Sequence, residues 1–92
     1  MLEKAVEQHL VRGVKALRGF CWKLTVPGVR GVPDRLCLLP GGNVVFVELK
    51  RPKGGRLSVH QKLLHSVMRG LGLRVEVFST KEEVDSFLEE FT

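Results

Sequence analysis

A strand–helix–strand succession in the second half of the chain most constrains its fold. Residues 44–50 and 73–78 are rich in the aliphatic side chains of strands, and residues 59–70 between them have helical spacing. A helical connection of this length joins two parallel strands. Residues 35–39 reach 44–50 through Pro40-Gly41-Gly42-Asn43, a hairpin turn that makes this second pair antiparallel. The sequence therefore predicts a mixed sheet.

The first third of the chain adds a helix and a strand. Residues 2–18 repeat apolar side chains at every third or fourth position, which predicts an amphipathic helix. Residues 20–26 have strand composition. Residues 27–33 contain two glycines and two prolines and are expected to form a loop.

Two capping-box patterns mark the starts of the remaining helices. Ser58 with Gln61 opens a helix that runs to about Gly70, and Thr80 with Glu83 opens one that runs to about residue 90. The predicted order is α-β-β-β-α-β-α. Ninety-two residues support one hydrophobic core, so we expect a single α/β domain over residues 1–92, with helices flanking the sheet.

The chain lacks the marks of a membrane or exported protein. Its apolar stretches are too short to span a bilayer, and its N-terminus has no signal-peptide core. We therefore expect a soluble cytoplasmic protein with no membrane partner.

Charge is distributed unevenly along the chain. Residues 1–74 carry 14 basic and 4 acidic side chains, whereas residues 75–92 carry 1 basic and 6 acidic ones. Clustered positive charge indicates a polyanionic partner, most commonly nucleic acid. The alternative is a solvated surface with a high pI. What distinguishes the two is the position of the few acids in the basic part.

Glu48 and Lys50 fall on the same face of the predicted strand 44–50, which is otherwise apolar there. A carboxylate and an ammonium on such a face are costly unless they are paired or ligated. Asp34 begins the partner strand, and the hairpin returns it toward Glu48. The alternatives are a surface ion pair for Glu48 and Lys50, and turn chemistry for Asp34.

The helix over residues 2–18 contributes two further acids. Glu3 and Glu7 lie one turn apart at the edge of its apolar stripe, so either could complete a carboxylate cluster with Asp34 and Glu48. They could also be acids favoured by the helix dipole. Carboxylates hold Mg²⁺, which polarises a phosphate and lowers the pKa of bound water, and a nearby lysine stabilises developing charge.

The histidines and cysteines have no spacing typical of a metal or thiol site. We expect His9, His60 and His65 to face solvent or to contact phosphate. Cys21 and Cys37 form neither a disulfide framework nor a zinc motif, and we expect both to be reduced and buried.

Three segments together resemble a known nuclease signature. Gly31-Val32-Pro33-Asp34-Arg35, followed after thirteen intervening residues by Glu48-Leu49-Lys50-Arg51, resembles the PD-(D/E)xK signature. Leu57-Ser58-x-x-Gln61 with its glycine-ended helix, and Val6-Glu7-x-x-Leu10-Val11, resemble the VRR-NUC (virus-type replication-repair nuclease) subgroup. The likeness extends over essentially the whole chain, as in stand-alone phage members.

The resemblance implies a restriction-endonuclease-like core and a metal-dependent site. Asp34, Glu48 and the Leu49 carbonyl would ligate Mg²⁺ or Mn²⁺. Lys50 would be the catalytic lysine, and Gln61 would orient water or phosphate. Glu7 would be the acid from the first helix, with Glu3 as the alternative. No small-molecule cofactor is implied.

The resemblance also implies a structure-selective DNA endonuclease that acts as a homodimer on four-way (Holliday) junctions, in the host cytoplasm if phage-encoded. A dimer supplies the two sites that symmetrical resolution needs. The expected phosphate contacts are the basic residues of the two flanking loops, namely Arg30, Arg35, Arg51, Lys53 and Arg56. The alternatives are a non-catalytic nucleic-acid-binding module on the same fold and a structural domain that uses its charges for solubility.

Overall fold

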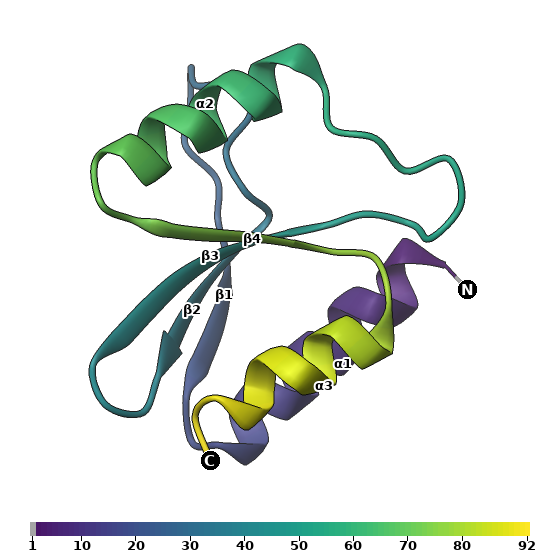
Figure 1. The fold of residues 1–92 in the computed structure, drawn as a ribbon, viewed down its shortest axis with the longest axis vertical. Coiled ribbons are helices and arrows are strands. Elements are labelled where there is room, and N and C mark those ends of the chain that lie inside the picture. Colours follow the sequence, from purple (N-terminus) through teal and green to yellow (C-terminus); the bar gives the residue numbers. More distant parts are fainter. Residues whose placement is uncertain (1) are drawn as a thin grey trace.

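The computed structural model describes residues 2–92 as a four-stranded sheet with three helices (Figure 1). The elements follow the predicted order. They are α1 (Glu3–Ala16), β1 (Phe20–Lys23), β2 (Arg35–Leu39), β3 (Asn43–Leu49), α2 (Val59–Gly70), β4 (Arg74–Phe78) and α3 (Lys81–Glu89).

The sheet is mixed, as predicted. Its strands lie in the order β1-β2-β3-β4, with β1–β2 and β2–β3 antiparallel and β3–β4 parallel. The helix α2 makes the crossover between the two parallel strands. The hairpin turn and the crossover both lie where the sequence places them.

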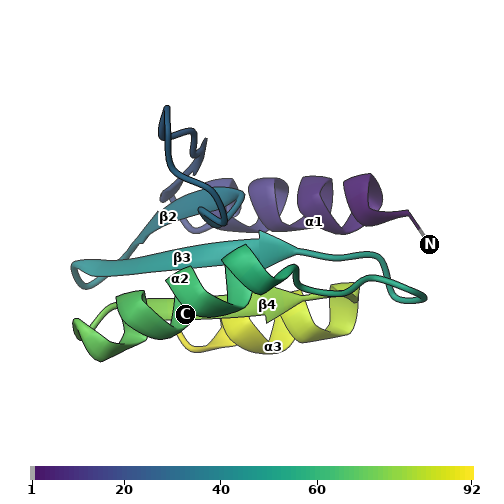
Figure 2. The same ribbon diagram turned by 90° about the horizontal axis from the view of Figure 1, so that it is seen from above.

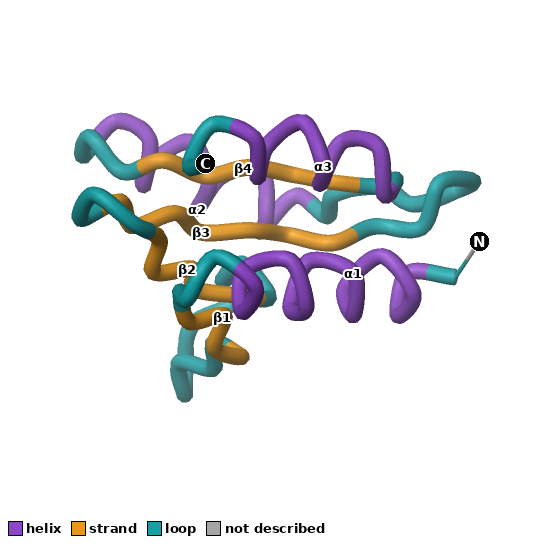
Figure 3. The backbone as a smooth tube through the Cα atoms, turned by 90° about the horizontal axis from the view of Figure 1, so that it is seen from below, coloured by secondary structure: helices purple, strands orange, loops and turns teal. Residues whose placement is uncertain are grey.

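The helices divide between the two faces of the sheet. In Figure 1, α2 lies on one side of the sheet, and α1 and α3 lie on the other. Figure 2 looks down on the α2 side, where α2 lies over β4. Figure 3 shows α1 running along the strands close to β1 and β2. The helices α1 and α3 pack closely against each other, since a Cβ added to Gly13 of α1 would lie 2.2 Å from Leu88 Cδ1 of α3.

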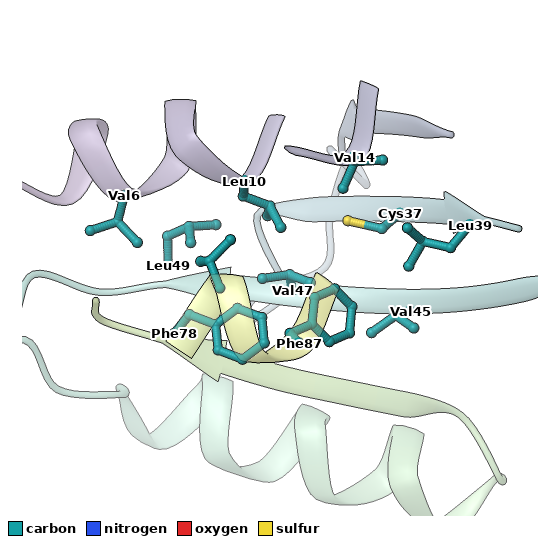
Figure 4. Packing of buried hydrophobic residues seen from close by; sticks show 11 residues of the cluster. Val6, Leu10, Val14, Cys37, Leu39, Val45, Val47, Leu49, Phe78 and Phe87 are labelled. Atoms are coloured by element: carbon teal, nitrogen blue, oxygen red, sulfur yellow. The ribbon is translucent and has the colours of Figure 1, made fainter. Parts of the chain in front are cut away.

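The main core lies between the sheet and the α1–α3 layer (Figure 4). The apolar stripe of α1 supplies Val6, Leu10 and Val14, all fully buried. They meet alternate side chains of β3 and the aromatic rings of β4 and α3. The core residues from these elements are Val45, Val47, Leu49, Phe78, Val84 and Phe87. Because strand side chains alternate faces, Glu48 necessarily points to the opposite side, toward α2.

The strand and the helix predicted in the first third of the chain are each shorter in the structure, and the predicted strands 44–50 and 73–78 differ by one residue at their ends. The strand over residues 20–26 ends at Lys23, because the chain leaves the sheet edge and only the Leu24 N–H still bonds the Asp34 carbonyl. The first helix ends at Ala16. Arg18 takes a left-handed conformation with φ of 64°, and the Gly19 N–H bonds the Val14 carbonyl. Both predicted capping boxes are present.

The two cysteines are free thiols that face each other across β1 and β2, with their sulfurs 3.7 Å apart. Cys37 is buried, as predicted. Cys21 is only half-buried, and the prediction was wrong here because β1 is an edge strand. Within residues 2–92, none of the helices has the length and apolar character needed to cross a membrane.

Candidate active site

The candidate site begins where Asp34 joins the hairpin to the end of β3. Asp34 precedes β2, and its Oδ2 accepts a 2.9 Å hydrogen bond from the Leu49 N–H. Arg35 pairs with Val47 in the sheet, and continuing this register places Asp34 across from Glu48. The structure therefore brings Asp34 and Glu48 together on the α2 side of the sheet.

Glu48 is a buried acid, only 1% exposed. Its Oε2 lies 3.4 Å from Lys50 Nζ, while its Oε1 is buried with no hydrogen-bond partner within the protein. Burial and, to a smaller extent, the neighbouring Asp34 carboxylate together raise the pKa of Glu48 to about 8, against the opposing pull of Lys50. In the absence of a cation, the protonated form of Glu48 is therefore favoured at neutral pH far more than in an ordinary glutamate.

His65 lies on the inner side of α2 and is fully buried. The prediction that it faces solvent or phosphate was wrong. Its Nε2 is 3.9 Å from Glu48 Oε1, and neither ring nitrogen has a hydrogen-bond partner within the protein. Burial lowers the pKa of His65, so the ring is neutral at pH 7.

The other two histidines are more exposed. His9 pairs with Asp85 of α3, with 2.6 Å between Nε2 and Oδ1. His60 lies beside Arg30, whose Nη1 is 3.4 Å from the imidazole Nε2. Only the Arg30–His60 contact lies near the candidate site.

Glu7 does not join the other two acids. Its Oε2 accepts a 2.9 Å hydrogen bond from Arg35 Nε, and Arg35 also donates to the Cys21 carbonyl. Arg35 shares the face of its sheet partner Val47, the face that α1 covers. Across residues 2–92, the structure forms no group of three or more acids, histidines and cysteines close enough to hold a metal ion. The expected three-acid cluster is therefore not assembled, because the Arg35 guanidinium competes for Glu7.

Lys50 borders an open hollow of about 280 Å³. Glu3 lines this hollow together with Arg51, Arg56 and two glycines. The loop after Lys50 folds tightly at this hollow. A Cβ on Gly55 would lie only 2.4 Å from the Arg51 carbonyl oxygen. Of the two α1 acids, Glu3 is thus the one that shares a hollow with Lys50.

Gln61 serves the first turn of α2. Its Oε1 accepts from the Ser58 N–H at 2.9 Å, which completes the capping box. The loop before Asp34 packs on the same turn. A Cβ on Gly31, whose φ is 87°, would lie 2.4 Å from the His60 carbonyl oxygen and 2.9 Å from the Gln61 nitrogen. Glycine at this position therefore lets the loop carrying Asp34 reach the start of α2.

Comparisons with known proteins show which family the fold belongs to. A solved structure of a "VRR_NUC domain" superposes with a TM-score of 0.90 and 32% identity, over 98% of this chain and 97% of the other. The phage protein "Putative nuclease p44" of Acyrthosiphon pisum secondary endosymbiont phage 1 is 40% identical over 80 residues, covering 87% of this chain and 85% of its own length. The chain belongs to the VRR-NUC nuclease family. No family model matches it.

A second hollow of this VRR-NUC protein is larger, about 530 Å³, and lies between β4 and α3. Its lining is acidic, including Glu76, Glu82, Glu83 and Glu90, and its one arginine is paired with Glu76 and Glu90. These carboxylates repel phosphate, so size does not identify the nuclease site.

The residues around Glu48 fit a hard divalent cation. The Asp34 and Glu48 carboxylates lie close enough to interact, and one buried oxygen of Glu48 has no partner within the protein. A buried polar atom of this kind is costly unless it is ligated. Oxygen donors are the ligands that Mg²⁺ and Mn²⁺ prefer. This VRR-NUC domain therefore has a donor set suited to such a cation.

Proposed function

We propose that this protein is a metal-dependent DNA endonuclease that hydrolyses phosphodiester bonds in four-way junctions as a homodimer. The carrying observation is the buried Glu48 carboxylate, with Asp34 beside it, Lys50 on one oxygen and no partner on the other. Family membership supports nuclease chemistry, and DNA in the host cytoplasm is the substrate that this chemistry implies.

Asp34, Glu48 and the Leu49 carbonyl would hold Mg²⁺, with Mn²⁺ as a substitute. The bound cation would polarise the scissile phosphate and lower the pKa of a coordinated water. Lys50 would orient the attacking water and neutralise charge that develops on the phosphate. Gln61, at the first turn of α2, would orient water or phosphate with its amide nitrogen, because its oxygen is engaged in the cap.

The acid from α1 acts less directly in this proposal. Glu3 lines the hollow beside Lys50 and is the acid we assign to the metal side. Glu7 is held by Arg35, so we assign this pair to fixing α1 on β2. Arg35, only 18% exposed, is accordingly not counted among the DNA contacts.

The DNA backbone would be bound by exposed basic residues in the loops on either side of the site. Arg30 lies in the loop before Asp34, and three others lie in the loop after Lys50, namely Arg51, Lys53 and Arg56. Contacts of this kind neutralise phosphates and make binding strongly dependent on salt.

The outer side of α2 supports a dimer. Val59, Leu63, Val67 and Leu71 follow one another at intervals of four residues and are 58–75% exposed. We call these four residues the outer α2 row. Exposed apolar surface of this extent is unusual on a monomer. A row spaced by four residues forms the ridge that packs one helix against another.

Exposed aromatic residues extend this surface on the same face of the sheet. Phe20 and Trp22 of β1 are 58% and 52% exposed. Through the paired residues of β2, they align with Val44 and Phe46 of β3, which share a face of the sheet with Glu48. The outer α2 row carries no charge, so two copies with a net charge of +5 each could approach there without direct repulsion. A second copy, related by a two-fold axis, is the proposed occupant.

Sedimentation of two variants tests the dimer. Leu63→Glu alters the outer α2 row, and Gln8→Glu, at an exposed position of α1, is the control. Both substitutions add one negative charge. We expect Leu63→Glu to be monomeric and to lose paired junction cuts, and Gln8→Glu to remain dimeric. A Leu63→Glu variant that sediments as a dimer would remove the proposed interface.

The activity is tested on a synthetic four-way junction beside linear duplex and single-stranded DNA, with Mg²⁺, Mn²⁺ or EDTA. Metal-dependent paired nicks that Lys50→Ala reduces by at least about 100-fold are expected. Cleavage without junction preference would leave the nuclease and remove the resolvase. Tight binding with no cleavage in either metal would favour a non-catalytic DNA-binding module.

A further inference from the structure

The buried polar atoms of His65 and Glu48 face each other across the inner side of α2. His65 Nε2 and Glu48 Oε1 are 3.9 Å apart, and each lacks a hydrogen-bond partner within the protein. Both side chains are at most 2% exposed. Buried polar groups are normally satisfied, so two unsatisfied groups that face each other indicate a contact used in another state of the site.

The backbone around His65 holds the ring in this position. Arg69, one turn further along α2, donates to the Val75 carbonyl of β4 at 2.8 and 3.2 Å. Gly31 packs on the first turn of α2. These contacts fix α2 at both ends. A shift of about 1 Å in the His65 and Glu48 side chains, with the helix in place, is enough to shorten the 3.9 Å distance between Nε2 and Oε1 to that of a hydrogen bond.

We propose that His65 is a positioning residue for Glu48. In this proposal the imidazole Nε2–H donates to Glu48 Oε1 and fixes the orientation in which the carboxylate meets a divalent cation. The inference rests on the proposed metal-dependent function. It differs from that function because it assigns a role to a side chain that touches neither the DNA nor the cation.

The chemistry of the two groups favours this direction of donation. A neutral imidazole has one N–H to give, and the Gly31 carbonyl is the competing backbone acceptor near the ring. A carboxylate whose proton has been released to solvent as the cation binds is the stronger acceptor. Carboxylate ligands of metals are commonly held by such outer hydrogen bonds, and losing one costs about 10–100-fold in metal affinity.

The first test measures Mn²⁺ affinity by calorimetry on the DNA-free protein. His65→Leu removes the donor at similar volume, His65→Gln keeps an N–H donor, and Met68→Leu is a control on the same side of α2. We expect Mn²⁺ affinity to fall about 10–100-fold in His65→Leu. The His65→Gln affinity should lie closer to wild type, and Met68→Leu should match it. Thermal unfolding in EDTA should show that His65→Leu is as stable as wild type, which separates positioning from folding.

The second test needs no variant. Nitrogen-15 NMR of the wild-type imidazole, with and without MgCl2, should show the proton on Nε2 and slower exchange of that proton when Mg²⁺ is present. A proton on Nδ1, or a His65→Leu variant with wild-type Mn²⁺ affinity, would overturn the role of His65 while leaving the nuclease intact. A wild-type protein that binds neither ion would overturn the proposed function and this role together.

Discussion

Asp34 Oδ2 accepts a hydrogen bond from the backbone N–H of Leu49, and this bond joins the loop before β2 to the end of β3. Leu49 lies between Glu48 and Lys50, so a single contact fixes the relative position of all three site side chains. Asp34 therefore has a structural role, through this bond, and an electrostatic role, because its carboxylate also raises the pKa of Glu48. The two roles can be separated by substitution.

Replacing Asp34 by Asn keeps an oxygen for the Leu49 N–H and removes the charge. We expect Asp34→Asn to unfold in EDTA within about 1 kcal/mol of wild type and to lose at least about 100-fold in Mg²⁺-dependent cleavage. Asp34→Ala leaves the buried N–H unpaired and should lose a further ~1–3 kcal/mol of stability. Thermal unfolding and junction cleavage measure the two effects, and full cleavage by Asp34→Asn would remove Asp34 from the metal site.

The raised pKa of Glu48 predicts an unusual dependence of stability on pH in EDTA. The pKa is about 8 in the folded protein against an ordinary value of 4.5, so the folded state binds a proton more tightly than the unfolded state. This stabilisation is complete below pH 4.5 and is lost as pH rises through about 8. Stability should therefore fall across this window in the wild type relative to Glu48→Gln, which has no proton to lose.

The measurement is the difference in unfolding free energy between wild type and Glu48→Gln across that pH window. Glu89→Gln, which alters an exposed acid of α3, is the control and should follow the wild type. Calorimetry should also show that Mn²⁺ binding releases a proton at pH 7, because the cation binds the ionised carboxylate. A difference that does not change with pH would contradict a buried, protonated Glu48.

The elements were predictable because their signals are local. Each capping box joins two residues that are three positions apart, Ser58 with Gln61 and Thr80 with Glu83. The hairpin turn likewise joins strands that are adjacent in the chain. The meeting of Asp34 and Glu48 also follows from local information, because hairpin register and strand alternation suffice to predict it.

The burial of His65 was not predictable in the same way. The apolar side chains of α2 form one broad sector that includes the exposed outer α2 row, so the apolar pattern alone does not point to His65 as the buried residue. Which side of α2 is buried depends on its packing against β4, where Arg69 donates a hydrogen bond to the Val75 carbonyl. A usable signal did exist, because Gln61, His65 and Met68 recur at intervals of four and three residues on one side of the helix.

The Glu7–Arg35 pair shows a second limit. Helical spacing places Glu7 at the edge of the apolar stripe, which leaves two destinations for its carboxylate. The choice depends on Arg35, which is 28 residues away and reaches the α1 face through its place opposite Val47. Competition between a cation-binding site and a nearby guanidinium is a tertiary effect that sequence spacing does not contain.

Replacing Glu7 by Gln should therefore act first on stability. The pair is part-buried, so leaving Arg35 without its anionic partner should lower the unfolding free energy in EDTA by about 1–2 kcal/mol. Mn²⁺ affinity should stay within about twofold of wild type, whereas Glu3→Gln should weaken Mn²⁺ binding without loss of stability. Urea unfolding and calorimetry test both. A Glu7→Gln variant that binds Mn²⁺ as weakly as Asp34→Asn would show that Glu7 leaves Arg35 to serve the metal.

Replacing Arg56 by Ala should weaken DNA binding and leave the chemistry intact. Arg56 is exposed and lines the hollow beside Lys50, where it can meet a phosphate without touching the reacting atoms. One lost phosphate contact should reduce the slope of log affinity against log salt by about one, with cleavage at saturating DNA unchanged. Lys15→Ala, an exposed change at the far end of α1, should alter neither. If Arg56→Ala bound DNA with wild-type affinity and salt slope, the loop after Lys50 would not be part of the DNA surface, and Arg30 on the other side of the site would be the next residue to test.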